Sequence, residues 1–246
     1  MLLAWIVGFT LLGSVGAIAL AGSFLLFPEK TRQFLVPCLI SYATGTLLGA
    51  AFLGLIPHAL DDIPASSALP TVLGGIVLFF VLEKLVVWRH CHDEHCEMHG
   101  TAGPLILIGD ALHNFGDGVV IAATFLTSIP LGLSTSLAVV AHELPQETGD
   151  FAILLESGYS RSRAFLYNIL SSLSALLGAL LAYLFLRGIR MAIPFIMALS
   201  AASFIYIAIA DLIPNLHRRA ALAQGIRQSA LMLAGIGTIV LFHLGR

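Results

Sequence analysis

The feature that most constrains this chain is a series of long apolar segments separated by short polar breaks. A helix needs about 20 mostly apolar residues to cross the hydrocarbon core of a bilayer. Eight such segments follow one another, at residues 2–27, 34–60, 68–88, 104–128, 131–156, 163–187, 191–216 and 225–244. Only 11% of the residues are charged, whereas soluble domains carry about 25%. We therefore predict an all-α, polytopic membrane protein with eight transmembrane helices, in which residues 1–246 form a single transmembrane domain.

Composition also limits the partners of the chain. The net charge of −2 is too small to imply nucleic acid or another polyanion, so the expected surroundings are the lipid bilayer. The first segment lacks a basic n-region and is too long for the apolar core of a signal peptide, so we expect it to stay as the first spanning helix, with no soluble domain after it. The three cysteines, Cys38, Cys91 and Cys96, do not make a disulfide framework.

Basic residues predict the orientation, because Lys and Arg accumulate at the cytoplasmic ends of spanning helices. With the N-terminus outside, the cytoplasmic ends hold Lys30, Arg32, Lys84, Arg89, Arg161, Arg163, Arg218, Arg219 and Arg227. The opposite ends hold only Arg187, Arg190 and Arg246. We therefore expect a multi-pass protein with both termini outside the cytoplasm. The expected location is the cell membrane, in a bacterium the inner membrane.

The second and seventh segments carry a related sequence near their ends. The second has Gly-Leu-Ile-Pro-His at 54–58, and the seventh has Asp-Leu-Ile-Pro-Asn at 211–215. In the predicted topology these helices run in opposite directions, as in transporters built from inverted repeats. The pattern is compatible with such a repeat and also with chance recurrence in a chain rich in leucine and isoleucine.

Two neighbouring segments carry polar stripes near the middle of the membrane. In segment 104–128 the polar residues are spaced i, i+3, i+4 and i+7, which places them on one helix face; they are Asp110, His113, Asn114 and Asp117. Segment 131–156 carries a second stripe at helical spacing, formed by His142, Glu143, Gln146, Glu147 and Asp150.

The carboxylates in these stripes need a positive counterpart. A charge at the centre of a spanning helix costs roughly 2.5–3.5 kcal/mol even on insertion scales, and buried charges persist when they are paired or bind metal. No Lys or Arg occurs between Arg89 and Arg161, so the positive charge must come from protons or bound cations. Imidazole with carboxylate is the ligand set of Zn²⁺ and its divalent neighbours. We therefore predict a mid-membrane metal site, in preference to histidines that only pack or a proton relay without metal.

The same residues resemble the signatures of a known family. His113-Asn114-Phe115-Gly116-Asp117-Gly118 is similar to the HNxxDG motif in the fourth helix of ZIP (Zrt/Irt-like) transporters. Residues 142–150, HELPQETGD, resemble the HExPHExGD motif in the fifth helix of the LIV-1 branch. The resemblance extends to eight helices, external termini and a His-rich loop after the third helix, in a chain of the size of prokaryotic members.

The resemblance implies a transport site for one or two ions between the fourth and fifth helices. The first subsite would consist of His113, Asp117, His142 and Gln146. Asn114 and Glu143 would contribute to the second, with Asp117 or Gln146 as a bridge. Gln146 departs from the usual His or Glu, and its neutral amide is a weaker donor. Further metal candidates are Glu147, Asp110, Asp150 and Asn168, with His58 and Asp211 as ligands on the way in and out.

Segment 89–103 is expected to be a cytoplasmic loop that collects or senses metal. Its candidate ligands are His90, Cys91, His92, His95, Cys96 and His99. In a reducing cytoplasm the cysteines stay thiols, which suit Zn²⁺ or Cu(I). The segment lacks regular CxxC spacing, which argues against a folded zinc site. The alternative is a solvated linker without a metal role.

The predicted function is import of a divalent transition metal into the cytoplasm, with zinc first and Fe²⁺, Mn²⁺ and Cd²⁺ as further cargo, without a cofactor or enzyme activity. One alternative is a cation-diffusion exporter, which also uses HxxxD, although such exporters resemble six-helix proteins with a cytoplasmic domain. The other is an intramembrane metallohydrolase, which would need HExxH, whereas the chain has His142-Glu143-Leu144-Pro145-Gln146. The sequence leaves the metal selectivity and the oligomeric state open, a homodimer included.

Overall fold

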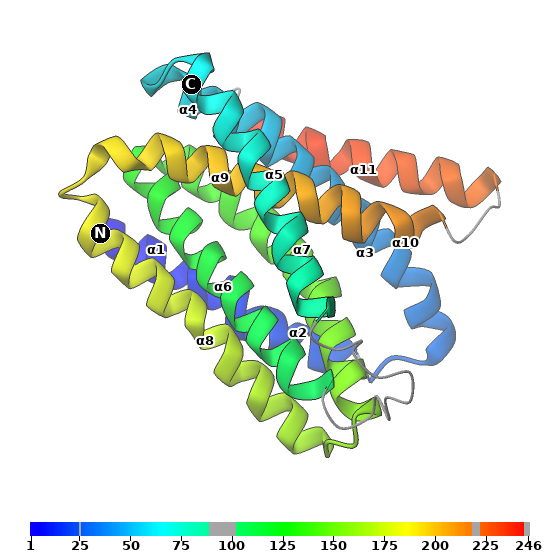
Figure 1. Ribbon diagram of the computed structural model, residues 1–246. Coiled ribbons are helices and arrows are strands. Elements are labelled where there is room, and N and C mark those ends of the chain that lie inside the picture. The colour runs from blue at the N-terminus through cyan, green and yellow to red at the C-terminus, as the bar shows by residue number, and fades with distance from the viewer. Residues whose placement is uncertain (25, 89–101, 218–221, 244–246) are drawn as a thin grey trace.

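A computed structural model describes residues 1–24, 26–88, 102–217 and 222–243 of the chain (Figure 1). Those residues form helices and no strand, so the all-α prediction is confirmed. The helices, in chain order, are α1 (Leu2–Leu11), η1 (Leu12–Gly16), α2 (Ala17–Phe24), α3 (Glu29–Gly49), η2 (Ala50–Leu55), α4 (Ile56–Asp62), α5 (Ala65–Trp88), α6 (Ala102–Thr127), α7 (Ile129–Glu156), α8 (Arg161–Leu186), η3 (Arg190–Ala192), α9 (Ile193–Tyr206), η4 (Ile207–Leu212), α10 (Ile213–His217) and α11 (Leu222–His243).

The eight predicted spanning segments correspond to these helices. Several pieces join end to end, so that α1, η1 and α2 make the first span, α3, η2 and α4 the second, and η3 to α10 the seventh. Within the described ranges, 7 helices are long and apolar enough to cross a membrane by length and composition. The eighth predicted span, α7, is not among these seven; it is 28 residues long and carries the second polar stripe.

The predicted break between the first and second helices is too long. The sequence placed the residues from Glu29 to Gln33 between spans, whereas the structure begins α3 at Glu29. Pro28 precedes the helix with extended backbone (ψ 147), and Glu29 lies in the first turn, where a negative charge is favourable beside the helix dipole. The Gln33 amide donates to Glu29 Oε1 at 2.9 Å. These local contacts extend the helix through a polar segment that hydropathy alone assigns to a loop.

The second and seventh spans share a local irregularity. A π-helical segment, η2 or η4, ends one residue before each Ile-Pro pair, at Ile56-Pro57 and Ile213-Pro214. Proline has no N–H and frees the carbonyl four residues earlier, and that carbonyl falls inside the π-helical segment in both spans. The two related sequences therefore adopt the same local structure, and a third π-helical segment, η1, lies in the first span, which has no proline.

Close backbone contacts join the helices in pairs, and α6 with α8 and α3 with α11 lie side by side (Figure 1). A Cβ built at Gly118 would lie 1.8 Å from the Ala175 carbonyl oxygen, and one at Gly45 would lie 2.0 Å from the Met232 carbonyl oxygen. Small residues let membrane helices approach in this way. Helix α7 packs against α6, α2 and α3, so its polar stripe lies inside the bundle and faces α6.

Candidate metal centre

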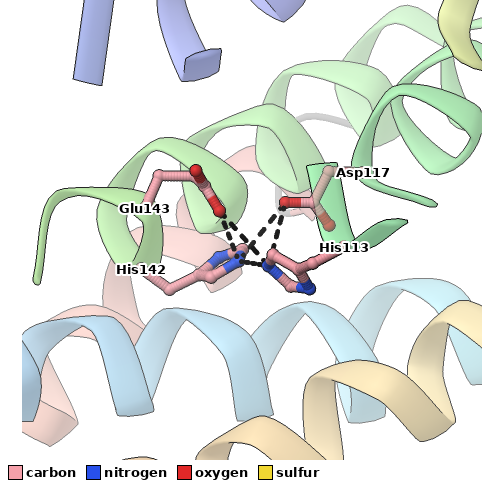
Figure 2. Close-up of side chains that lie close together, drawn as sticks. All are labelled: His113, Asp117, His142 and Glu143. Atoms are coloured by element: carbon pink, nitrogen blue, oxygen red, sulfur yellow. Dashed lines mark hydrogen bonds and ion pairs between the residues drawn. The ribbon is translucent and has the colours of Figure 1, made fainter. Parts of the chain in front are cut away.

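The site is built from the polar faces of α6 and α7, which are joined by Ser128 alone. Ser128 begins α7 by accepting a hydrogen bond from the backbone N–H of Leu131 at 3.3 Å. Because the connection is so short, the two helices run antiparallel and pack along their length. Figure 2 shows His113 and Asp117 from α6 and His142 and Glu143 from α7 pointing toward one another.

Four ligand atoms converge between these helices. The His113 and His142 Nε2 atoms are 3.1 Å apart. The His113 Nε2 lies 3.6 Å from Asp117 Oδ2 and 3.2 Å from Glu143 Oε1. The His142 Nε2 lies 3.3 Å from the same Asp117 oxygen and 3.4 Å from the same Glu143 oxygen. Among the His, Cys, Asp and Glu residues that the structure describes, this is the group in which three or more ligand atoms lie within 4.8 Å of one another.

Three of these separations fall in the range of a tetrahedral zinc site, and the other two are 0.1–0.2 Å shorter. Zinc bonds of about 2.0–2.2 Å to nitrogen and oxygen place tetrahedral ligands about 3.3–3.6 Å apart. The five measured separations run from 3.1 to 3.6 Å. Two imidazole nitrogens and two carboxylate oxygens also form a donor set that zinc uses. The cluster therefore has the dimensions and the chemistry of a first coordination shell.

One ring is held in the form that binds metal. The Ala138 carbonyl accepts a hydrogen bond from His142 Nδ1 at 2.9 Å. With the proton on Nδ1, the neutral ring presents a lone pair at Nε2, which is the atom that faces the cluster. Two ring nitrogens 3.1 Å apart need a proton or a cation between them. The close approach is therefore compatible with a hydrogen bond between two neutral rings and with an ion that both nitrogens bind.

The burial of the four side chains also bears on whether a cation is bound. His142, Glu143 and Asp117 are 1%, 0% and 4% exposed, while the His113 side chain is 18% exposed. Two buried carboxylates without a Lys or Arg on either helix are unfavourable unless a cation neutralises them. His113 is the one member of the group with appreciable access to the surroundings.

The remaining residues of the two stripes lie beside this group. Asn114 is buried and donates through Nδ2 to Asp110 Oδ1 at 2.8 Å. Asp110, Glu147 and Asn168 are buried, and Gln146 and Asp150 are half-buried. The resemblance grouped Gln146 with the two histidines and assigned Glu143 to a second subsite. In the structure Glu143 Oε1 joins both histidines.

Two distant candidates lie outside the four-residue group. His58 is 6% exposed, and its Nδ1 lies 2.8 Å from the Gly54 carbonyl oxygen. Asp211 is exposed and lies in η4. The loop ligands of segment 89–101, namely His90, Cys91, His92, His95, Cys96 and His99, lie outside the described residues.

The sequence reasoning missed the serines of α8. Ser171 Oγ donates to Asp110 Oδ2 at 2.5 Å, and Ser174 Oγ donates to the Ala111 carbonyl at 2.6 Å. Both contacts join α8 to the polar face of α6. Their signal in the sequence is the run from Ser171 to Ser174 in an otherwise apolar helix, since hydroxyl groups in spanning helices often bond to a neighbouring helix.

Comparison with known proteins agrees with the site. Residues 88–243 match the sequence profile of the family described as ZIP Zinc transporter. This chain belongs to that family. The match includes α6 and α7, which supply every residue of the metal centre, and the family is one of transporters.

Individual relatives of this ZIP protein show how the chain aligns. It is 33% identical to Zinc transporter ZIP13 of Pongo abelii over 84% of this chain and 66% of the relative. It is 37% identical to Zinc transporter ZIP10 of Danio rerio and 41% identical to Zinc transporter foi of Drosophila melanogaster, each over 57% of this chain. ZIP10 and foi are members of the LIV-1 subfamily, in agreement with the motif pattern. The chain spans 17% and 20% of the length of these two relatives.

Proposed function

We propose that this ZIP protein carries divalent transition-metal ions, zinc first, across a membrane into the cytoplasm. The observation that carries the proposal is the buried group of His113, Asp117, His142 and Glu143, whose ligand separations suit tetrahedral zinc. The group lies midway along two spanning helices, so an ion bound there has left water on one side without reaching it on the other. Fe²⁺, Mn²⁺ and Cd²⁺ are further cargo to be compared.

The proposed ligand set is these four residues together with Gln146, which faces the same side of α7 as His142 because it lies one turn further along. The amide oxygen of Gln146 would bind the ion as a fifth ligand, or would take the place of one of the two carboxylates as the ion leaves. His58 and Asp211 are proposed as ligands on the two sides of the centre. The loop at 89–103 is proposed to collect metal on the cytoplasmic side.

The proposed orientation follows from the charge bias, with both termini outside the cytoplasm and import directed inward. In a bacterium the chain would lie in the inner membrane as a single transmembrane domain. A homodimer is the assembly to test first, by measuring the mass of the protein in nanodiscs. The ion gradient, with proton exchange at the carboxylates as a contributor, is the proposed driving force, since no nucleotide-binding motif occurs in the sequence.

The test is radiometal uptake by proteoliposomes that contain the purified chain in a known orientation. Zinc should accumulate in wild-type vesicles and should stay at the level of empty vesicles with Asp117→Ala. Membrane insertion of the variant, checked by flotation, should be unchanged, because insertion does not need a costly polar group. An equal uptake by the variant would refute the assigned centre, and export against the proposed direction would favour the exporter alternative.

A further inference from the structure

The amino-terminal ends of α3 and α11 lie at the same end of the helix bundle. The two helices are side by side (Figure 1). A Cβ built at Gly45 of α3 would meet Met232 of α11, and one built at Gly49 would meet Ile239. Because these contacts advance in the same direction along both helices, α3 and α11 run parallel. In the proposed topology their first turns lie on the cytoplasmic side of the membrane.

Two arginines meet at this end of the pair. Arg32 lies in the first turn of α3, and Arg227 lies in the second turn of α11. The guanidinium carbon of Arg227 is 4.3 Å from the centroid of the Phe34 ring, so this side chain reaches across to the start of α3. Both arginines are half-buried, and the Nε atom of each is shielded from solvent. A guanidinium in such surroundings needs acceptors for its N–H groups.

The neighbouring protein groups do not supply those acceptors. Within the described ranges every ion pair belongs to the histidine group, and the Nε atoms of Arg32 and Arg227 have no hydrogen-bond partner there. Glu29 is the acidic residue in the first turn of α3, and its Oε1 already accepts from the Gln33 amide at 2.9 Å. Lys30 beside it is exposed. Three positive charges thus lie near one carboxylate, and the excess favours an anion.

Apolar surface adjoins the two arginines. Phe34 is 53% exposed, and Ile226, next to Arg227, is 64% exposed. The apolar segment of the second span begins at residue 34, so the arginines lie at the boundary between hydrocarbon and headgroups, where lipid phosphates are found. Arginine binds phosphate through paired N–H groups and stacks on aromatic rings. A soluble phosphate would use the charges alone, whereas a phospholipid also covers the apolar side chains.

We propose that Arg32 and Arg227, with Lys30 beside them, bind the phosphate of an anionic phospholipid at the amino-terminal ends of α3 and α11. In the proposed topology this lipid belongs to the cytoplasmic leaflet. Phe34 orients the Arg227 guanidinium, and the acyl chains lie against the exposed apolar side chains. An anionic headgroup is favoured over a zwitterionic one because it adds no positive charge to a site that already has an excess. The site lies apart from the metal centre, and its binding of lipid is independent of the direction of transport.

The experiment is native mass spectrometry of the full chain purified in detergent, with dioleoylphosphatidylglycerol or dioleoylphosphatidylcholine added at equal concentration. We expect the wild type to bind phosphatidylglycerol more tightly than phosphatidylcholine. Arg32→Gln and Arg227→Gln should each lose at least about tenfold in phosphatidylglycerol affinity, because each removes charge-assisted hydrogen bonds. Arg163→Gln removes an exposed arginine from the start of α8, also on the cytoplasmic side in the proposed topology. It is the matched control and should bind the lipid like the wild type.

Two more variants separate the site from misfolding and from a general effect of charge. Glu29→Gln removes the opposing carboxylate and should raise phosphatidylglycerol affinity at least about threefold, a gain that a misfolded protein would not show. Arg227→Lys keeps the charge but loses the paired N–H groups and the stacking on Phe34. It should bind phosphatidylglycerol at least about threefold more weakly than the wild type.

Soluble phosphates distinguish the source of the anion. Inorganic phosphate and glycerophosphoglycerol, which lack acyl chains, should fail to displace the lipid at equal concentration, and displacement by either would overturn the lipid assignment. The proposal is also overturned if the two lipids bind equally, or if Arg32→Gln and Arg227→Gln bind phosphatidylglycerol like the wild type. An equal loss of affinity in Arg163→Gln, or wild-type affinity in both Glu29→Gln and Arg227→Lys, would overturn it as well.

Discussion

Replacing Gly118 with alanine tests whether the contact of α6 with α8 sets the geometry of the metal centre. A Cβ at residue 118 would lie 1.8 Å from the Ala175 carbonyl oxygen and 2.8 Å from the Ala179 backbone nitrogen. Real Cβ contacts are essentially never shorter than 3.0 Å, so the two backbones must separate by about 1.2 Å in a close-packed interior. A backbone carbonyl cannot rotate away as the end of a side chain can.

The expected cost follows from two opposing effects. Overpacking a core costs about 1–3 kcal/mol, and the upper end applies because the obstacle is backbone. Alanine recovers about 1 kcal/mol through its higher helix propensity. The net destabilisation is therefore about 2 kcal/mol, which is roughly a 30-fold change in the unfolding equilibrium. Zinc uptake should also fall, because the hydrogen bond from Ser171 to Asp110 joins the same two helices.

Gly116 provides the matched control, two residues earlier in the same motif. A Cβ at residue 116 meets nothing within 4 Å, so Gly116→Ala should be neutral or stabilise the protein by up to about 1 kcal/mol. The assay is equilibrium unfolding of both variants in mixed micelles, with zinc uptake measured in parallel. Equal stability of the two variants would refute the claim that the α6–α8 contact constrains the fold.

Three further predictions concern the metal. His113→Ala and Asp117→Ala should each abolish zinc uptake while leaving membrane insertion intact, measured by uptake and flotation; wild-type rates would exclude these ligands. Gln146→His should tighten Zn²⁺ and Cd²⁺ binding more than Mn²⁺ or Fe²⁺ binding, because soft ions gain most from imidazole; competitive uptake of the four metals tests this, and an unchanged profile would place Gln146 outside the coordination shell. The third prediction is that changing every His and Cys of the loop to Ser should leave a working transporter whose uptake differs only at low metal concentration. Complete loss of uptake would mean that the loop supplies an obligatory transport ligand. The positions are His90, Cys91, His92, His95, Cys96 and His99.

The spans and the polar stripes could be predicted because they depend on short-range properties of the chain. Hydropathy over about 20 residues decides whether a helix can cross a bilayer, and 3.6-residue periodicity decides which side chains share a face. The pair of His113 and Asp117 is one turn apart on one helix, and its ligand atoms are 3.6 Å apart in the structure. Hydropathy does not register hydrogen bonds between polar side chains, such as the one from Gln33 to Glu29. It therefore does not predict that α3 begins at Glu29.

The partners across helices were decided only by the tertiary structure. The family resemblance assigned Glu143 to a second subsite, whereas Glu143 Oε1 lies 3.2 Å from His113 Nε2 and 3.4 Å from His142 Nε2. The bond from Ser171 to Asp110 likewise joins residues far apart in the chain. Such contacts depend on the rotation and the axial offset of each helix relative to its neighbour. Those two quantities are set by packing over the whole interface, including backbone contacts such as Gly118 with Ala175, and no single helix contains that information.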